Sequence, residues 1–500
     1  MKPAITIREE SIAVQPTPLW QAAAAQCPLC GGRRREYLFV VGQSRMTRCH
    51  ECGLISCMDG SGNGAPRSAS SYLLDAAAAE SLREGLSGRI LQVTFGGQGQ
   101  LMLDPRVPQV ALALPKDAQA LESIEPCSFD SAFVNGVVEQ VRDPVALLRQ
   151  IRAALKPEGT LSLVVGSGDL ARLPSDEGKL PRFVFQPATL LRLAIAAAFD
   201  PRACGLLARS LQGRVDERVD LPVRFSRIHR LLGAMGKRTA VESGLLELRA
   251  KVAEAPRSPR LTILMPVFNE ARTFRDTFDR VAAWRMDGLE REIVVIESNS
   301  TDGSRELVQA IESEPGVRVI YQEQPRGKGH AVRAGLRAAS GDIVLIQDAD
   351  SEYDVSDYDI VLEPLLRLSA TFVLGSRHMG GRTWKIRKFA DFRALSWLMN
   401  LAHEFFTRLA NWVYDADVRD PTTMYKVFRR ECVEGVAFRR DRFDFDWELV
   451  CKLMRHGHTP LEVPINYRSR TYAEGKKVRF FRDPLTWLAA ILSSRFEPLR

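Results

Sequence analysis

One stretch of this sequence restricts the possible folds more than any other. Residues 343–346 read Ile-Val-Leu-Ile, and Gln347-Asp348-Ala349-Asp350 follows them directly. A short apolar run predicts one buried strand, and ligands of open α/β sheets bind beyond the carboxyl ends of such strands. Side chains at i and i+2 of an extended segment point the same way. Asp348 and Asp350 are therefore candidate ligands of one divalent cation, and oxygen ligands favour Mg²⁺ or Mn²⁺.

The residues before this strand alternate between strand and helix patterns. Apolar runs end at Val267, Glu297 and Tyr321, and helical patterns separate them. Alternation of this kind predicts an α/β domain with a mostly parallel sheet and crossover helices. We place its start at about residue 259, because Ala255-Pro256-Arg257-Ser258-Pro259 is a typical boundary segment.

The same half of the chain resembles family 2 glycosyltransferases. The resemblance rests on "LTILMPVFNEARTF", "EIVVIESNSTDGSREL", "GKGHAVRAGLRAASGDIVLIQDADSEYD", "VLGSRHMGG", "RDPTTMYKVFRR" and "FDFDWELVCKLMRHGHTPLEVPINYRSRTYAEGKKVRFFRD", in that order. It is nearest to the dolichyl-phosphate mannosyltransferase and glucosyltransferase subgroup. It implies a GT-A fold over residues 259–500 and inverting transfer of a hexose from a GDP- or UDP-sugar to a polyprenyl phosphate.

The resemblance also implies roles for individual residues. Asp350 and Asp348 would bind the metal, and Arg377, Arg393 and Glu448 would complete the catalytic set. The residues expected to bind the donor are Pro266, Phe268, Glu270, Glu297, Asp302, Lys328 and Asp348. The family usually has two Asp where Glu297 and Ser298 stand, so this chain loses one carboxylate there.

The acceptor side leaves two chemistries open. Arg377, Arg393, Arg470 and Lys476 are the residues expected to hold a phosphate acceptor, because guanidinium groups suit bidentate phosphate contacts. A phosphate is already an oxyanion, whereas a hydroxyl acceptor needs a carboxylate base. Asp420, Asp446 and Glu448 supply candidates for that base. Transfer to a hydroxyl in surface-polysaccharide assembly is therefore the alternative function.

Four cysteines form two close pairs near the N-terminus. Cys27 and Cys30 are separated by two residues, as are Cys49 and Cys52. Two such knuckles supply the four thiolates of a tetrahedral zinc site. We predict a structural zinc ribbon over residues 20–60, in a reducing compartment.

The segment after the ribbon resembles class I methyltransferases that use S-adenosylmethionine (SAM). "FDSAFVNGVVEQVRDP" and "LLRQIRAALKPEGTLSLVV" carry the resemblance, which implies a Rossmann-like domain over residues 72–202. The cofactor half departs from the family: Gln92 stands in place of an Asp, and Thr94 and Gln98 in place of Gly. We therefore expect a degenerate domain without SAM. An active methyltransferase and a non-catalytic scaffold that binds a partner are the alternatives.

The remaining features concern the connector and the surroundings of the protein. Residues 203–258 are Arg-rich and predict a helical connector, with apolar spacing near 3.6 over residues 241–252. The formal net charge of +8 favours phosphates or an anionic membrane face over nucleic acid. We expect no signal peptide and no transmembrane helix. The protein should be cytoplasmic and peripherally bound to the inner membrane face, with the segment from about residue 480 to 492 either on the membrane or packed on the domain.

Overall fold

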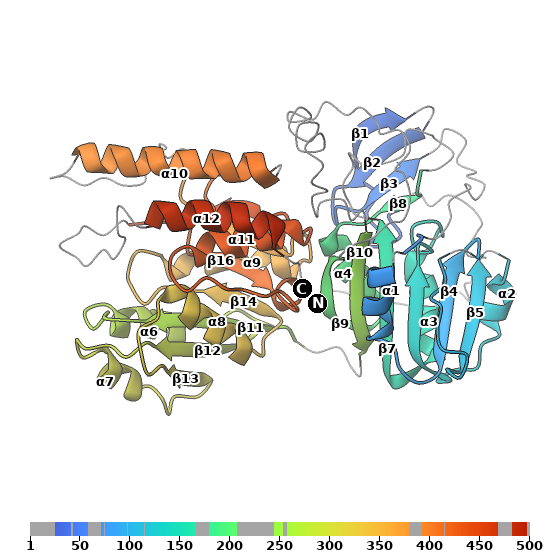
Figure 1. Ribbon diagram of the computed structural model, residues 1–500, viewed down its shortest axis with the longest axis horizontal. Helices are drawn as coiled ribbons and strands as arrows, with labels where there is room; N and C mark the ends of the chain where they lie inside the picture. Colours follow the sequence, from blue (N-terminus) through green and yellow to red (C-terminus); the bar gives the residue numbers. More distant parts are fainter. Residues whose placement is uncertain are drawn as a thin grey trace, which may run out of the picture.

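A computed structural model describes residues 26–41, 44–58, 72–74, 76–97, 99–114, 116–166, 180–207, 245–253, 258–379, 393–414, 416–468 and 483–497. The chain forms two α/β bodies and a small N-terminal sheet (Figure 1). This is the α/β class expected for both halves. Among the described residues, no helix is long and apolar enough to cross a membrane.

The small sheet carries the four cysteines. Its strands run in the order β1 (Arg35–Val41), β2 (Ser44–Cys49), β3 (Ile55–Met58) and β8 (Phe183–Val184), all antiparallel. In the sequence, β8 lies between β7 and β9 of the larger sheet, so the ribbon is joined to the next domain by backbone pairing. A ribbon bounded at residue 60 is therefore too short a description of this unit.

The second body is a six-stranded sheet in the order β5-β4-β6-β7-β10-β9. Its strands are β4 (Ile90–Phe95), β5 (Gln109–Leu114), β6 (Phe129–Asn135), β7 (Leu155–Gly166), β9 (Phe199–Leu206) and β10 (Leu245–Val252). Its helices are α1 (Ala76–Arg83), α2 (Ala118–Glu122), α3 (Pro144–Ala154) and α4 (Pro187–Ala196). β4, β5, β6 and β7 are parallel, and β10 is antiparallel to both β7 and β9.

β10, with the end of β9, corrects the prediction of a helical connector at residues 203–206 and 245–252, whereas residues 208–244 of that segment lie outside what the structure describes. Leu245, Leu246 and Leu248 are buried in the sheet, and Glu247 is also buried, beside Arg249. The segment contains good helix formers, but pairing with β7 and β9 on both sides overrides this local preference. The sheet of the N-terminal domain therefore extends to Val252, well past the expected boundary at residue 202.

The C-terminal body is a seven-stranded sheet in the order β13-β12-β11-β14-β16-β15-β17. Its strands are β11 (Arg260–Val267), β12 (Glu290–Glu297), β13 (Val317–Tyr321), β14 (Ile343–Ile346), β15 (Phe372–Ser376), β16 (Lys426–Arg429) and β17 (Leu461–Pro464). β11 to β14 are mutually parallel, as predicted, whereas β16 runs antiparallel to both β14 and β15.

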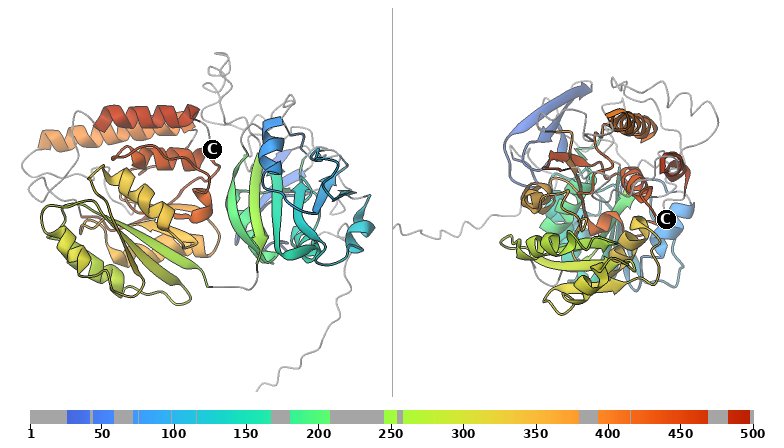
Figure 2. Two further views of the ribbon diagram at one scale, coloured as in Figure 1. Left: turned by 60° about the horizontal axis from the view of Figure 1, so that its bottom comes forward. Right: turned by 90° about the vertical axis from the view of Figure 1, so that its left-hand side faces the viewer.

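Helices flank this sheet (Figures 1 and 2). They are α6 (Phe274–Ala283), α7 (Ser304–Gln309), α8 (Lys328–Ala338), α9 (Tyr358–Leu366), α10 (Arg393–Tyr414), α11 (Phe445–Arg455) and α12 (Asp483–Phe496), with short 3₁₀ turns η4 (Val355–Asp357) and η5 (Arg430–Cys432). α12 packs through Trp487, Ala490 and Ile491 against α10 and α11. Of the two positions expected for the C-terminal segment, the structure shows packing on the domain.

Candidate functional site

The two carboxylates of the opening motif lie directly after β14, at the end of the parallel strands. Gln347 is fully buried and fixes the backbone, because its side-chain nitrogen donates to the carbonyl of Asp348 at 2.9 Å. Thr277 of α6 donates its hydroxyl to the carbonyl of Asp350 at 3.2 Å. Hydrogen bonds from the side chains of Gln347 and Thr277 to its carbonyls thus hold the backbone of this loop in place.

The two aspartates have different surroundings. Asp350 is buried, and its Oδ1 accepts a hydrogen bond from the backbone N–H of Glu352 at 3.0 Å. Asp348 is part-buried and forms an ion pair with Lys328, at the start of α8. Lys328 also contacts the sulfur of Met424 at 2.9 Å. The ammonium group of Lys328 therefore balances the charge of Asp348. The carboxylates of Asp348 and Asp350 are oxygen ligands of the kind that suits a hard divalent ion.

The loops after β11 and β12 are bound to each other. Asp302 accepts the backbone N–H of Ala271 at 3.0 Å and the hydroxyl of Ser304 at 2.6 Å. Burial alone would raise the pKa of Asp302, but these hydrogen bonds outweigh it and hold the pKa below its usual value. Glu270 is another residue expected to bind the sugar nucleotide, and its backbone N–H donates to the hydroxyl of Ser304 at 2.8 Å. Asp302 thus links the loop after β12 to the loop after β11, where the sugar nucleotide is expected to bind.

Glu297 lies at the end of β12, and its two oxygens have different partners. Oε1 accepts the backbone N–H of Ser300 at 2.6 Å. Oε2 is buried, receives no hydrogen bond from the described residues and lies 3.3 Å from Arg305. Ser298, which stands where an Asp was expected, donates to Gln322 at 2.9 Å. Pro266 and Phe268 flank the end of β11 and are half-buried.

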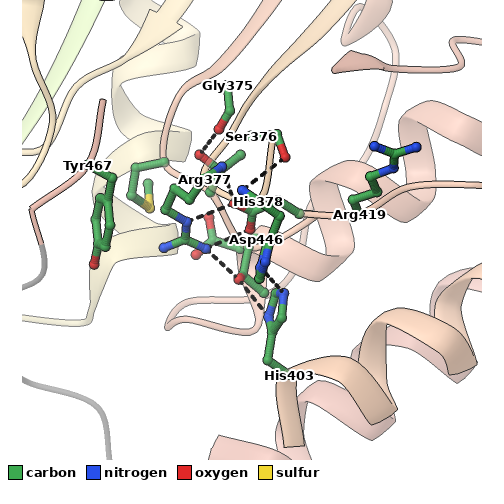
Figure 3. A network of polar contacts seen from close by, with 12 residues as sticks. Gly375, Ser376, Arg377, His378, His403, Arg419, Asp446 and Tyr467 are labelled. Carbon is green, nitrogen blue, oxygen red and sulfur yellow. Dashed lines mark hydrogen bonds and ion pairs between the residues drawn. The ribbon is translucent and has the colours of Figure 1, made fainter. Parts of the chain in front are cut away.

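Arg377, at the end of β15, lies in a buried ion pair. Its side chain donates to Asp420 at 2.7 and 2.8 Å, and its backbone N–H donates to the same carboxylate at 2.9 Å. Burial works against both charges, yet Asp420 raises the pKa of Arg377 and Arg377 lowers the pKa of Asp420. Tyr467 stacks under the guanidinium, with the ring centre 5.0 Å away (Figure 3). A phosphate at Arg377 would therefore have to share it with Asp420.

The two carboxylates proposed as acceptor-side bases are also paired. Asp446 lies 3.0 Å from the fully buried Lys426. Glu448 is fully buried, accepts the backbone N–H groups of Arg439 and Arg440, and forms an ion pair with Lys452 at 2.8 Å. These contacts give Glu448 a structural position in α11. The catalytic role that the resemblance implies for Glu448 stays a prediction.

Several expected site residues fall outside what the structure describes. Arg393 begins α10, but its side chain is not described. Arg470, Lys476 and Gln98 lie outside the described residues as well. The basic residues on either side of the site therefore remain predictions.

Sequence reasoning missed one group of residues beside Arg377. His378 and His403 face each other with their Nε2 atoms 3.2 Å apart (Figure 3). A carboxylate oxygen of Asp420 lies within 4.8 Å of a ring nitrogen of each. The histidines are 25 residues apart and lie on different elements, so no spacing in the sequence signals their contact.

The four cysteines converge as predicted. The sulfurs of Cys27 and Cys52 are 3.6 Å apart, as are those of Cys30 and Cys49. The hydrogen bond from Cys52 lowers the pKa of Cys27 to about 5, so this group holds a thiolate near neutral pH. Four converging sulfurs fit a tetrahedral zinc ion, which these residues would hold.

In the N-terminal domain, Gln92, which stands in place of the family's Asp, is hydrogen-bonded to the protein's own backbone. The amide of Gln92 accepts from the backbone of Leu101 at 2.8 Å and donates to its carbonyl at 3.1 Å. Tyr72 donates its hydroxyl to the buried Glu139 at 2.9 Å. Burial raises the pKa of Glu139 to about 8, so it is largely protonated near neutral pH.

Two family profiles match this chain. Residues 262–436 match glycosyl transferase family 2, and residues 100–163 match a methyltransferase domain. Both agree with the resemblances drawn from the motifs. The first match spans β11 to β16 and therefore includes the aspartates, Lys328, Arg377 and Asp420.

The curated relatives of this chain include three glycosyl or hexose transferases. Glycosyltransferase AglJ of Haloferax volcanii is 29% identical over 231 residues, 46% of this chain and 69% of that protein. Dolichol-phosphate mannosyltransferase of Pyrococcus furiosus is 27% identical over 217 residues, 43% of this chain and 59% of that protein. Dolichyl-phosphate hexose transferase of Haloferax volcanii is 29% identical over 213 residues, 42% of this chain and 83% of that protein.

Among solved structures, glucosyl-3-phosphoglycerate synthase of Mycobacterium tuberculosis is similar. It is 22% identical, covers 48% of this chain and 82% of its own, and has a TM-score of 0.35. Its complex with Mn²⁺, uridine diphosphate and glucosyl-3-phosphoglycerate is 23% identical, with 48% and 81% coverage and a TM-score of 0.34.

Proposed function

We propose, on the premise that the C-terminal half of this chain is a family 2 glycosyltransferase domain, that it transfers a hexose from a GDP- or UDP-sugar to a polyprenyl phosphate. The observation that carries this proposal is the pair Asp348 and Asp350 at the end of β14, within a domain whose relatives include dolichyl-phosphate hexosyltransferases. We infer inversion at the anomeric carbon from the family resemblance.

Asp350 and Asp348 would hold Mg²⁺ or Mn²⁺ in this reaction. A bound divalent ion supplies Lewis-acid stabilisation to the leaving nucleoside diphosphate. Lys328 contributes a positive charge beside Asp348. Glu297 Oε2, which lies 3.3 Å from Arg305 and receives no hydrogen bond from the described residues, would accept from a donor hydroxyl or base N–H alongside that arginine. Thr273 and Thr277 of α6 keep the aspartate loop in place through its carbonyls, because their hydroxyls donate to Ala349 and Asp350.

The pairing of the carboxylates favours a phosphate acceptor over a hydroxyl. A general base must be within reach of the proton that it takes, but Asp446 is bound to Lys426 and Glu448 to Lys452 and two backbone N–H groups. An acceptor that is already ionised needs no such base. Transfer to a sugar hydroxyl is the second candidate, and it requires one of these ion pairs to open.

Two helices support delivery of the acceptor at a membrane surface. α10 presents Leu401, Phe405 and Trp412 to solvent, with 45%, 57% and 45% of their surfaces exposed. Their spacing places them on one face of the helix. α12 lies beside α10, with Tyr414 of α10 donating to the carbonyl of Ile491 at 2.7 Å, and it also carries exposed apolar residues (Figure 2). An amphipathic ridge of this kind suits peripheral binding at a cytoplasmic membrane face.

A transfer assay with purified protein tests the proposed function. Radiolabelled GDP- and UDP-hexoses are offered with polyprenyl phosphate in one reaction and with a glycan acceptor in another, each with Mg²⁺ or Mn²⁺. We expect label in the organic phase with polyprenyl phosphate only, and the anomeric configuration of the product reports inversion. Label in the glycan alone would replace the proposal by the second candidate.

Substitution of the metal-binding aspartate tests the role of the motif. Asp350→Ala should lower turnover by at least about 10²-fold, the order expected for loss of one strong electrostatic contact in the transition state. Asp287→Asn is the matched control, because Asp287 is an exposed aspartate in the turn before β12. Full activity of Asp350→Ala would refute the metal role.

A further inference from the structure

Three ligand-type side chains meet beside the end of β15. His378 follows β15, His403 lies in α10, and Asp420 precedes β16. One ligand atom from each lies within 4.8 Å of the other two. The imidazole rings are nearly parallel, at 14°, with centres 5.1 Å apart. Three elements that are distant in sequence therefore direct two nitrogens and one carboxylate toward a common point.

We propose that His378, His403 and Asp420 form a second metal site, which takes a borderline transition-metal ion such as Zn²⁺. The Nε2 atoms are 3.2 Å apart. Two imidazoles bound to one tetrahedral zinc at about 2.0–2.1 Å would have nitrogens about 3.3 Å apart. The observed separation of the two Nε2 atoms therefore matches that of two histidines bound to one zinc ion. An N₂O ligand set selects against Mg²⁺, unlike the all-oxygen pair Asp348 and Asp350.

The surroundings of His403 fit a metal ligand. Its Nδ1 lies 3.2 Å from the hydroxyl of Thr422, which also accepts from Arg377 at 3.0 Å. A hydroxyl oxygen has two lone pairs, so Thr422 can accept from Arg377 and from Nδ1–H of His403 together. That arrangement leaves the lone pair on Nε2. Metal-bound histidines usually donate their other ring N–H to an oxygen in this way.

Asp420 is a fixed and ionised partner. It is fully buried, its backbone N–H donates to Glu462 at 2.8 Å, and its carboxylate accepts three hydrogen bonds from Arg377. Only one of the three, from Nη2, reaches Oδ1, so this oxygen keeps a lone pair that an ion can use. The positive charge of Arg377 opposes the ion, so we expect micromolar affinity or weaker.

The ion would have two consequences. It would tie α10 to the ends of β15 and β16, so it should raise the thermal stability of the C-terminal domain. It would also place positive charge beside Arg377, whose own charge is balanced by Asp420. A role of that charge in binding the acceptor phosphate rests on the proposed function, whereas metal binding itself does not.

Metal counting on the full chain tests the site. Wild type, His378→Gln, His403→Gln and the double variant are stripped with a chelator, titrated with Zn²⁺ and compared for bound ion per chain. We expect the double variant to bind one equivalent less than wild type, and each single variant to bind that equivalent at least ten-fold more weakly. The cysteine site contributes equally to all four proteins. His330→Gln is the matched control and should bind as wild type does.

Cobalt spectroscopy on the wild type covers the case in which a variant misfolds. Co²⁺ at the cysteine site gives an intense thiolate charge-transfer band, whereas Co²⁺ on two histidines and a carboxylate gives only weak ligand-field bands. We expect a second equivalent of Co²⁺ to add weak ligand-field bands and no further thiolate charge-transfer band. Identical zinc stoichiometry in all folded variants, or no second cobalt spectrum, would show a hydrogen-bonded histidine pair only and overturn the proposal. Neither measurement uses transferase activity, so the two proposals fail separately.

Discussion

At the scale of single residues, four carboxylates of the transferase motifs have a basic partner. Asp348 pairs with Lys328, Asp420 with Arg377, Asp446 with Lys426 and Glu448 with Lys452. Three of these pairs are almost completely buried, where charges are costly unless they are matched. The motifs therefore carry structural demands as well as chemical ones, and substitutions must be interpreted with both in mind.

A substitution of Glu448 distinguishes a structural role from a catalytic one. Glu448→Ala leaves the N–H groups of Arg439 and Arg440 without their acceptor, and Lys452 keeps only one of its two carboxylates, Glu497 at 2.8 Å. We expect the free energy of unfolding to fall by at least about 2 kcal/mol, from two donors left unsatisfied at roughly 1–3 kcal/mol each, while turnover per folded molecule changes less than about three-fold. Urea unfolding and activity at equal folded concentration measure the two. Glu363→Ala is the control, because its exposed pair with Arg367 should contribute less than about 1 kcal/mol. A large loss of turnover in folded Glu448→Ala would show that Glu448 takes part in the reaction.

The Arg377–Asp420 pair predicts a pH dependence. Burial raises the pKa of Asp420, but the charge of Arg377 outweighs it, so the pKa lies below its unfolded value. The pair therefore contributes its full stability above the unfolded pKa of about 3.9 and loses it as the pH falls through the lower folded value. We expect Asp420→Asn to be less stable than wild type at pH 7, with the difference shrinking below pH 4. Chemical unfolding of both proteins across this range measures it, and a constant difference would contradict the assignment.

At the scale of elements, α10 gives the prediction on membrane binding. Phe405→Ser together with Trp412→Ser removes two large apolar side chains from its exposed face. We expect binding to anionic vesicles to weaken at least ten-fold, while transfer to a short-chain, water-soluble acceptor phosphate stays within about two-fold of wild type. Met102→Ser, which changes a side chain that is 80% exposed on the N-terminal domain, is the control. Unchanged vesicle binding in the double variant would remove α10 from the membrane contact.

The elements also show which features the sequence predicts. β14 and its two aspartates follow from a local pattern, since four buried residues in a row end in charge. β10 does not, because its strand character depends on β7 and β9, which are distant in the chain. The histidine pair is missed for the same reason: His378 and His403 meet only after α10 packs over the end of β15. Nonlocal pairing, not weak local signal, sets the limit in both cases.

At the scale of the whole molecule, the two α/β bodies meet through β9 and the region around η5. His458, which precedes β17, lies fully buried in this interface, and its Nε2–H donates to the carbonyl of Cys204 at 2.6 Å. Its Nδ1 accepts from Thr371 at 2.9 Å. Gly205 lies against His456, where an added Cβ would come within 3.1 Å of the ring. The two domains are therefore in direct contact at this interface.

This interface predicts acid sensitivity at a pH above that of the carboxylates. Burial lowers the pKa of His458 from 6.5 to about 4, so the folded protein keeps the ring neutral while the unfolded chain protonates it. Stability is therefore complete above pH 6.5 and is lost as the pH falls toward 4. Between pH 7 and pH 5 the loss should be about 2 kcal/mol, from roughly 1.36 kcal/mol per pH unit below 6.5.

His458→Gln provides the comparison, because its amide can still donate to Cys204 but does not titrate. We expect its midpoint of thermal unfolding to fall less than that of wild type between pH 7 and pH 5. His50→Gln, at an exposed histidine of the ribbon, should follow wild type. Parallel pH profiles of wild type and His458→Gln would show that the domains are not held together through a neutral His458. Separate melting of the two domains at pH 5 but not at pH 7 would locate the acid-sensitive step at this interface.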